Sequence, residues 1–321
     1  FAPPRCSIAF IETLPKTERG PRAERSMERQ YLMAAAPSWL GCLFKEMYGR
    51  ARPGRVTALL RDAPPGGLDQ PDREGTTLLV AAVQRGYTKC ARVLLSAGAD
   101  PDAAGDARGH VALMVACCHG RPQMVKLLLR SGAATGATDT AGMTAAHHAA
   151  AASRPSCLRL LLRAAPRLAA SADREGLTVL MHAAMADCVP AIKILRAAGV
   201  PTDTRAPRTL FTADEMAAAY DNTAAMGELL DAEQYTDVRL LHTAAAHDST
   251  DSIARLLGRG WSPNAETDFG RTPLHLAARR GAVGAIKQLI ASGAVVDVRD
   301  DIGQTPLIRA CLGQAIDGVV A

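Results

Sequence analysis

Histidines recur along this chain at positions where they could ligate a metal ion or act as general bases. The pair His147-His148 is followed by His182, His242 and His275, and imidazole is both a common metal ligand and a proton shuttle. A zinc site would also need carboxylate or cysteine ligands at suitable spacing. His148 and His182 have no such neighbours at ligand spacing, so we expect no metal site there.

The cysteines show no pattern of a metal or redox site. None of the eight forms a C-x-x-C pair. In the run Cys117-Cys118-His119, neighbouring side chains of a helix point in different directions and cannot easily share one metal or substrate. Sequence motifs for phosphate binding, such as G-x-G-x-x-G, and for hydrolases, such as G-x-S-x-G, do not occur. We therefore predict no catalytic residue, no metal, no cofactor and free thiols in a reducing cytoplasm.

Glycines show that the chain is built from repeats. Gly75, Gly109, Gly142 and Gly176 are 34, 33 and 34 residues apart, and Gly270 and Gly303 are 33 apart. In most units an Asp-x-x-Gly turn places the glycine where a left-handed backbone is needed. A threonine two residues later can cap a helix. The clearest unit starts Asp268-Phe-Gly-Arg-Thr-Pro-Leu-His-Leu-Ala-Ala.

That unit resembles the ankyrin-repeat consensus almost position for position. The resemblance implies an all-α ankyrin-repeat solenoid of helix-turn-helix units with β-turn fingers, about eight repeats in all. We predict an extended N-terminal arm over 1–38, an irregular N-terminal capping repeat over 39–71 and ankyrin repeats over 72–321. Repeats are predicted to start near 72, 106, 139, 173, 207, 237, 268 and 300. Those near 207 and 237 lack the turn glycine, and the last is incomplete.

The resemblance also gives the histidines a structural role. His147, His242 and His275 take the place of the histidine in Thr-Pro-Leu-His, which in this family hydrogen-bonds the turns of adjacent repeats. His148 and His182 lie one residue later, toward the concave face, where a partner could touch them.

Partners of this family usually dock on the concave face, which is built from fingers and first helices. The ends of this face are polar and basic and its middle is apolar, which favours a helix or extended peptide with apolar anchors and an acidic end. The alternative is a shallow surface of small residues with no partner. The predicted contact residues are Arg85, His119, His148, His182, Met185, Tyr220, His247, Arg279 and Arg280, with the finger aromatics Phe211, Trp261 and Phe269. Each aromatic could equally pack between repeats.

The charge distribution argues against nucleic acid. Eleven basic and seven acidic side chains lie up to residue 71, and 26 basic and 25 acidic lie beyond, so the repeat body has no basic stripe to neutralise phosphates. No apolar run reaches the length of a membrane span. We expect one or more protein partners, no nucleic acid, no membrane and a cytoplasmic location that could include the cytoskeleton or cilium. A large assembly is one way to order the N-terminal arm.

The leading functional prediction is a non-enzymatic scaffold or adaptor for protein-protein interaction. One alternative is a structural subunit of a cytoskeletal or ciliary, microtubule-associated assembly. Another is the regulatory or substrate-adaptor region of a longer enzyme or ubiquitin-ligase component.

Overall fold

The computed structural model describes residues 38–49, 51–63, 67–72, 74–230 and 238–313. The predicted arm, except Ser38, and the last repeat from residue 314 onward lie outside these residues.

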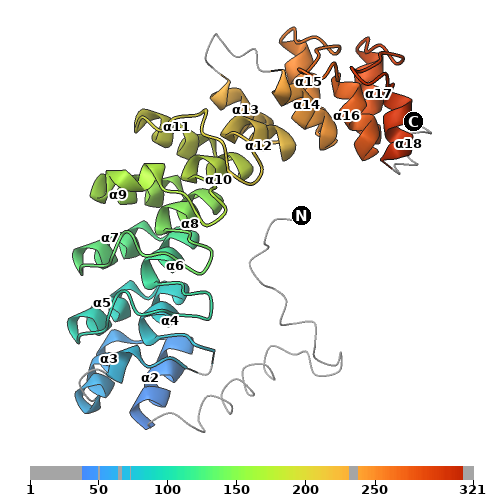
Figure 1. The fold of residues 1–321 in the computed structure, drawn as a ribbon. Coiled ribbons are helices and arrows are strands. Elements are labelled where there is room, and N and C mark those ends of the chain that lie inside the picture. Colours follow the sequence, from blue (N-terminus) through green and yellow to red (C-terminus); the bar gives the residue numbers. More distant parts are fainter. Residues whose placement is uncertain (1–37, 50, 64–66, 73, 231–237, 314–321) are drawn as a thin grey trace, which may run out of the picture. The chain divides into compact units, whose positions relative to one another are not determined.

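Within the described residues, regular structure is helical apart from two isolated β-bridges. From α4 onward the helices come in pairs, and we call the helix that follows each finger turn the first helix (Figure 1). The first helices are α4 (Leu78–Arg85), α6 (Ala112–Cys118), α8 (Ala145–Ala151), α10 (Val179–Met185), α12 (Ala213–Ala219), α14 (Arg239–Ala246), α16 (Pro273–Arg280) and α18 (Pro306–Leu312). The second helices are α5 (Thr88–Ser96), α7 (Pro122–Arg130), α9 (Pro155–Ala164), α11 (Val189–Ala197), α13 (Thr223–Leu229), α15 (Thr250–Gly258) and α17 (Val283–Ala291). The predicted all-α repeat architecture is confirmed.

The chain divides into two compact units, residues 1–107 and 108–321. In the first unit, α2 (Ser38–Tyr48) packs on α4, and α3 (Pro53–Leu59) packs on α5. Short 3₁₀ turns lie at Leu60–Asp62 and Gly67–Asp69. The boundaries proposed from the sequence at residues 38 and 71 stay predictions.

In the second unit, each first helix packs against the next first helix, from α6 through α18. The second helices α7, α9, α11, α13, α15 and α17 form a parallel series of contacts. A further 3₁₀ turn, Pro166–Ala170, follows α9. Each repeat therefore buries its apolar face against a neighbour, as a nearest-neighbour solenoid requires.

Threonine caps begin the regular first helices. Thr77, Thr144, Thr178, Thr272 and Thr305 are the N-cap residues of their helices, as predicted. The hydroxyl of Thr178, for example, accepts the Met181 N–H at 3.3 Å. Such a side chain satisfies a backbone donor that the helix itself cannot use.

Finger turns precede these caps, and an aspartate holds four of the five turns; before Thr272, the hydroxyl of Thr267 takes its place and accepts the Arg271 N–H at 3.4 Å. Oδ1 of Asp173 accepts the N–H groups of Glu175 and Leu177 at 2.9 and 2.8 Å, and Gly176 has φ +80°. The turn before α12 departs from this pattern because Leu210 there has φ +58°. Its α12 cap, Thr212, is paired with Glu215, whose carboxylate accepts the Thr212 N–H at 2.9 Å.

Small side chains let the first helices pack closely. Ala183, Ala184 and Ala277 are fully buried. On the second helices, Leu94 and Leu128 fill the space between repeats and are also fully buried. Among the described helices, none is long and apolar enough to cross a membrane.

Candidate partner-binding surface

Buried histidines fix the finger turns to the helices that face them. His242 Nε2 lies 2.8 Å from the Arg271 carbonyl oxygen, and His275 Nε2 lies 3.1 Å from that of Gln304. Both acceptors belong to the finger of the next repeat, so the predicted cross-repeat role is confirmed for these two residues.

His147 occupies the same place in α8, but it makes only the hydrogen bond within its own repeat and not the one to the next repeat. Its Nδ1 accepts the Thr144 N–H at 3.1 Å, whereas its Nε2 is buried without a hydrogen bond. Burial, aided by the neighbouring His182, lowers the pKa of His147 to about 4. His147 is therefore neutral at physiological pH.

His148 and His182 require a correction. Contrary to the sequence-based expectation, each has a carboxylate neighbour, because a finger aspartate nine residues earlier turns back over the helix. His148 Nε2 lies 2.9 Å from Asp139 Oδ2, and His182 Nε2 lies 3.0 Å from Asp173 Oδ2. The side chains of His148 and His182 are only 15% and 11% exposed. They are engaged within the protein, which weakens their case as partner contacts.

The titration of Asp139 and His148 follows from their burial and contacts. Burial lowers the pKa of His148, against the opposing effect of its hydrogen bond to Asp139. Burial alone would raise the pKa of Asp139, but hydrogen bonds from the Met143 N–H and from His148 outweigh it and lower that pKa. The ionised carboxylate is thus the stable form of this buried aspartate.

The most exposed of the predicted aromatics lies on the finger before α16. Phe269 is 63% exposed, and the Arg271 guanidinium carbon lies 5.3 Å from its ring centre. Beside them is a pocket of about 260 Å³, which we call the finger pocket. It is lined by Val238, Arg239, Thr267, Asp268, Phe269, Arg271 and Leu276.

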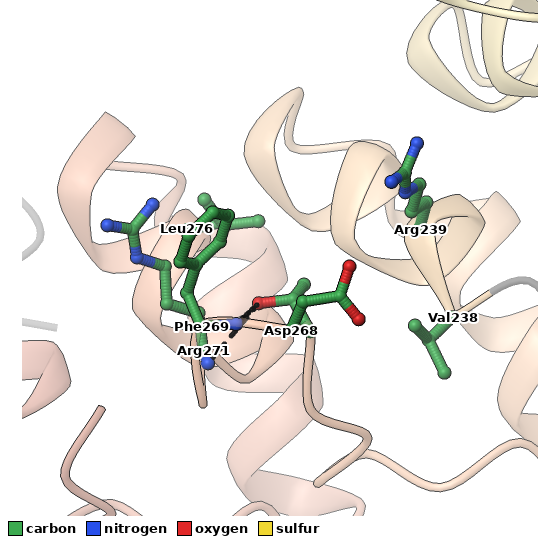
Figure 2. A pocket seen from close by; sticks show the side chains of 7 residues that line it. Val238, Arg239, Asp268, Phe269, Arg271 and Leu276 are labelled. Carbon is green, nitrogen blue, oxygen red and sulfur yellow. Dashed lines mark hydrogen bonds between the residues drawn. The ribbon is translucent and has the colours of Figure 1, made fainter. Parts of the chain in front are cut away.

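Figure 2 shows how the finger pocket is arranged. The Phe269 ring and the Arg271 side chain lie side by side on the finger, while the Asp268 carboxylate points toward the side from which Val238 and Arg239 project. Arg239 is exposed at the start of α14. The pocket therefore combines an apolar ring, two cationic side chains and the Asp268 carboxylate.

A second aromatic and basic group lies at the other end of α14. The Phe211 ring packs edge-on against His247, with ring centres 6.0 Å apart. Burial, and after it the charge of Arg280, lowers the pKa of His247, and Arg280 ends α16, the helix that packs against α14. We call Phe211, His247 and Arg280 the helix-end cluster. Arg280 and Arg279 are both exposed at the end of α16.

The other predicted contact residues lie apart from these two groups. Arg85 is exposed, with its guanidinium 5.4 Å from the centre of the Tyr48 ring. His119 is exposed at the end of α6, where its Nδ1 lies 2.9 Å from the Val115 carbonyl oxygen. Tyr220 is partly exposed. Met185 and Trp261 are half-buried.

Two sets of residues were not identified from the sequence. Arg239 and Arg271 line the finger pocket, yet the sequence shows no signal for them beyond their charge. The finger aspartates had a readable signal, because Asp139, Asp173 and Asp300 each precede a cationic or imidazole side chain by nine residues. Asp300 pairs in this way with Arg309.

A model of ankyrin repeats in three copies matches residues 49–139, 113–206 and 241–320. The chain belongs to the ankyrin-repeat family. Mouse ankyrin repeat and SOCS box protein 16 is 46% identical over 63 residues, 20% of this chain. The matched segment spans only 14% of that relative's length.

The ankyrin fold is also seen among solved structures. The ankyrin repeat domain of human ASB11 matches with a TM-score of 0.53 and 21% identity, over 66% of this chain and 97% of that domain. Ankyrin repeats bind protein partners, and the fold is typically a non-enzymatic interaction module.

Proposed function

We propose that this chain is a non-enzymatic adaptor that binds a partner protein along α14, between the finger pocket and the helix-end cluster. The exposed Phe269 ring beside Arg271 and Arg239 carries this proposal. Aromatic and arginine side chains contribute most to protein interfaces because they bury a large area and retain polar contacts.

The chemistry of the two groups describes the segment that would fit. An apolar side chain would cover the Phe269 ring, and acidic side chains would approach Arg239 at one end of α14 and Arg280 at the other. A helix of eight residues is about 12 Å long, which a short extended peptide or two to three helical turns can span. The proposed segment keeps the apolar anchor of the peptide expected from the sequence, but it has acidic side chains at both ends.

The test is affinity purification of the full chain, with quantitative mass spectrometry of what it retains. The Phe269→Ala and Arg280→Glu double variant should lose at least 80% of its main partner. Lys287→Glu is the matched charge reversal, because Lys287 is exposed on the second helix α17, and it should retain that partner. Undiminished binding by the folded double variant would show that partners dock elsewhere.

A second proposal is that the chain is the substrate-adaptor part of a longer protein. The match to a relative named for ankyrin repeats and a SOCS box favours it. The two proposals are compatible, because the docking surface would then receive the substrate. Sequencing the full-length transcript tests the second one, which requires an additional domain in the same reading frame.

A further inference from the structure

Two imidazoles and a carboxylate converge where the finger before α8 meets the preceding repeat. Asp139 Oδ2 lies 2.9 Å from His148 Nε2 and 3.5 Å from His110 Nε2. One ligand atom from each of the three residues lies within 4.8 Å of those of the other two. His110 comes from the turn before α6, so the group joins two adjacent repeats.

The surrounding structure orients the carboxylate toward the histidines. Asp139 Oδ1 accepts the N–H groups of Ala141 and Met143, each at 2.9 Å. Oδ2 is left to face both imidazoles, which meet edge to face with ring centres 5.0 Å apart. Hydrogen bonds that orient a ligand in this way are typical of metal sites.

The two distances from the carboxylate to the imidazoles are close to those that a zinc ion needs. Zinc binds nitrogen and carboxylate oxygen at about 2.0 to 2.2 Å, which places tetrahedral ligand atoms roughly 3.4 Å apart. The two carboxylate–imidazole separations, 2.9 and 3.5 Å, differ from this value by a few tenths of an ångström, and the third separation, between the two imidazole nitrogens, is within 4.8 Å. The side chains of His110 and His148 are 21% and 15% exposed, so solvent can reach the group and a water molecule can complete the coordination.

The same three positions recur in other repeats with different chemistry. One equivalent group is Met143, Asp173 and His182, in which methionine replaces the first histidine. In the other, Arg309 pairs with Asp300, and Arg271 Nε lies 3.9 Å from the same carboxylate. In each of these three groups a cation or a hydrogen-bond donor therefore lies beside the finger aspartate. Among them, only the group of His110, Asp139 and His148 has three good zinc ligands.

We propose that His110, Asp139 and His148 bind one divalent transition-metal ion, for which Zn²⁺ is the best match. Two nitrogens and one carboxylate oxygen suit zinc, whereas calcium and magnesium prefer oxygen alone. The ion would tie the turn before α6 to α8 and so strengthen the contact between these repeats.

The experiment is a Zn²⁺ titration of the metal-stripped full chain by calorimetry, with Co²⁺ as a spectroscopic substitute. The wild type should bind one ion with visible d–d bands of nitrogen and oxygen ligands, and without the intense thiolate bands that a cysteine site would give. His110→Ala should weaken this binding at least tenfold. His182→Ala is the matched control, because it removes the histidine of the two-ligand group, and it should bind like the wild type.

Stability supplies an independent measurement. Zn²⁺ should raise the melting temperature of the wild type and of His182→Ala, but not of His110→Ala. Should the alanine variant fail to fold, His110→Gln replaces it in both measurements. The proposal is overturned if the folded His110 variant binds Zn²⁺ as tightly as the wild type, or if the wild type binds none or shows only thiolate bands.

Discussion

Oδ1 of Asp248 accepts the backbone N–H of Ala285 at 2.6 Å, so a residue at the end of α14 caps α17 in the next repeat. Asp221 does the same for Ser252 in α15 at 2.7 Å, and Asp187 for Ala225 in α13 at 2.8 Å. All three aspartates have positive φ. They take the place of the positive-φ glycine that follows the first helices α4 and α16. None of the three capped helices has a side-chain cap of its own.

Two substitutions of Asp248 should therefore show separately how the helix cap and the strained backbone affect the free energy of unfolding. Asp248→Gly loses the cap, which costs about 1 kcal/mol, but it also removes the Cβ from a left-handed turn, which offsets part of that loss. Asp248→Ala loses the cap and keeps a Cβ at φ +59°, where alanine lacks the polar side chain with which aspartate tolerates this conformation, for a loss of about 1 to 2 kcal/mol. Urea denaturation should give the stability order wild type, glycine variant, alanine variant. Asp297→Ala, at an exposed loop aspartate, is the control and should change little.

Acid should destabilise the repeats through His147. Its pKa of about 4 in the folded protein lies below the ordinary value of about 6.5, so the unfolded chain takes up the proton first as the pH falls. The stabilisation is complete above about pH 6.5 and is lost progressively toward pH 4, by about 3 kcal/mol in total.

The variant His147→Gln tests this source of the pH dependence. A glutamine oxygen can accept the Thr144 N–H in place of Nδ1, as in a common capping box, but it does not titrate. Unfolding free energies between pH 7 and 4.5 should therefore fall less steeply in this variant than in the wild type. Gln123→Ala, at an exposed residue that does not titrate, is the control and should keep the wild-type slope. Equal slopes in all three proteins would assign the acid sensitivity to other groups.

Leu210 should be a site where glycine stabilises the protein. It has φ +58° and is 63% exposed, so its side chain gains little from burial and its backbone is strained. Leu210→Gly should raise the unfolding free energy by about 1 kcal/mol. Ile308→Gly, at another exposed aliphatic residue but in the interior of α18, should instead be destabilising.

The thiols should fall into two classes of reactivity. Cys42 and Cys311 are exposed, whereas Cys90, Cys117 and Cys157 are buried. The pKa of Cys117 is raised by its hydrogen bond to Cys157 and by burial. Brief alkylation followed by peptide mass spectrometry should label the exposed pair at least tenfold faster, and urea should abolish the difference. Rapid labelling of Cys117 in the folded protein would contradict its burial.

The metal proposal predicts that a second site can be built. Met143 holds the position equivalent to His110, beside the ready-made pair of Asp173 and His182. Met143→His should therefore raise the zinc stoichiometry from one to two ions per chain. Adding His182→Ala to this variant should lower the zinc stoichiometry to one ion per chain again. A stoichiometry of one in the folded Met143→His protein would show that this pair cannot serve as ligands.

The sequence alone determined the repeat, its turns and its caps. These depend on contacts between residues a few positions apart, so Gly176 and Thr178 could be assigned a conformation and a role from their spacing. The role of His275 followed from the family resemblance, since its acceptor lies in the next repeat.

Tertiary structure decided which polar side chains remain available to a partner. His147 and His148 are adjacent in the sequence, yet one is buried in a capping box and the other meets a finger aspartate. The approach of Asp139 depends on how the finger folds back over α8, and the approach of His110 depends on how two repeats stack. Spacing along one helix contains neither relationship, because both arise from the three-dimensional path of the fingers.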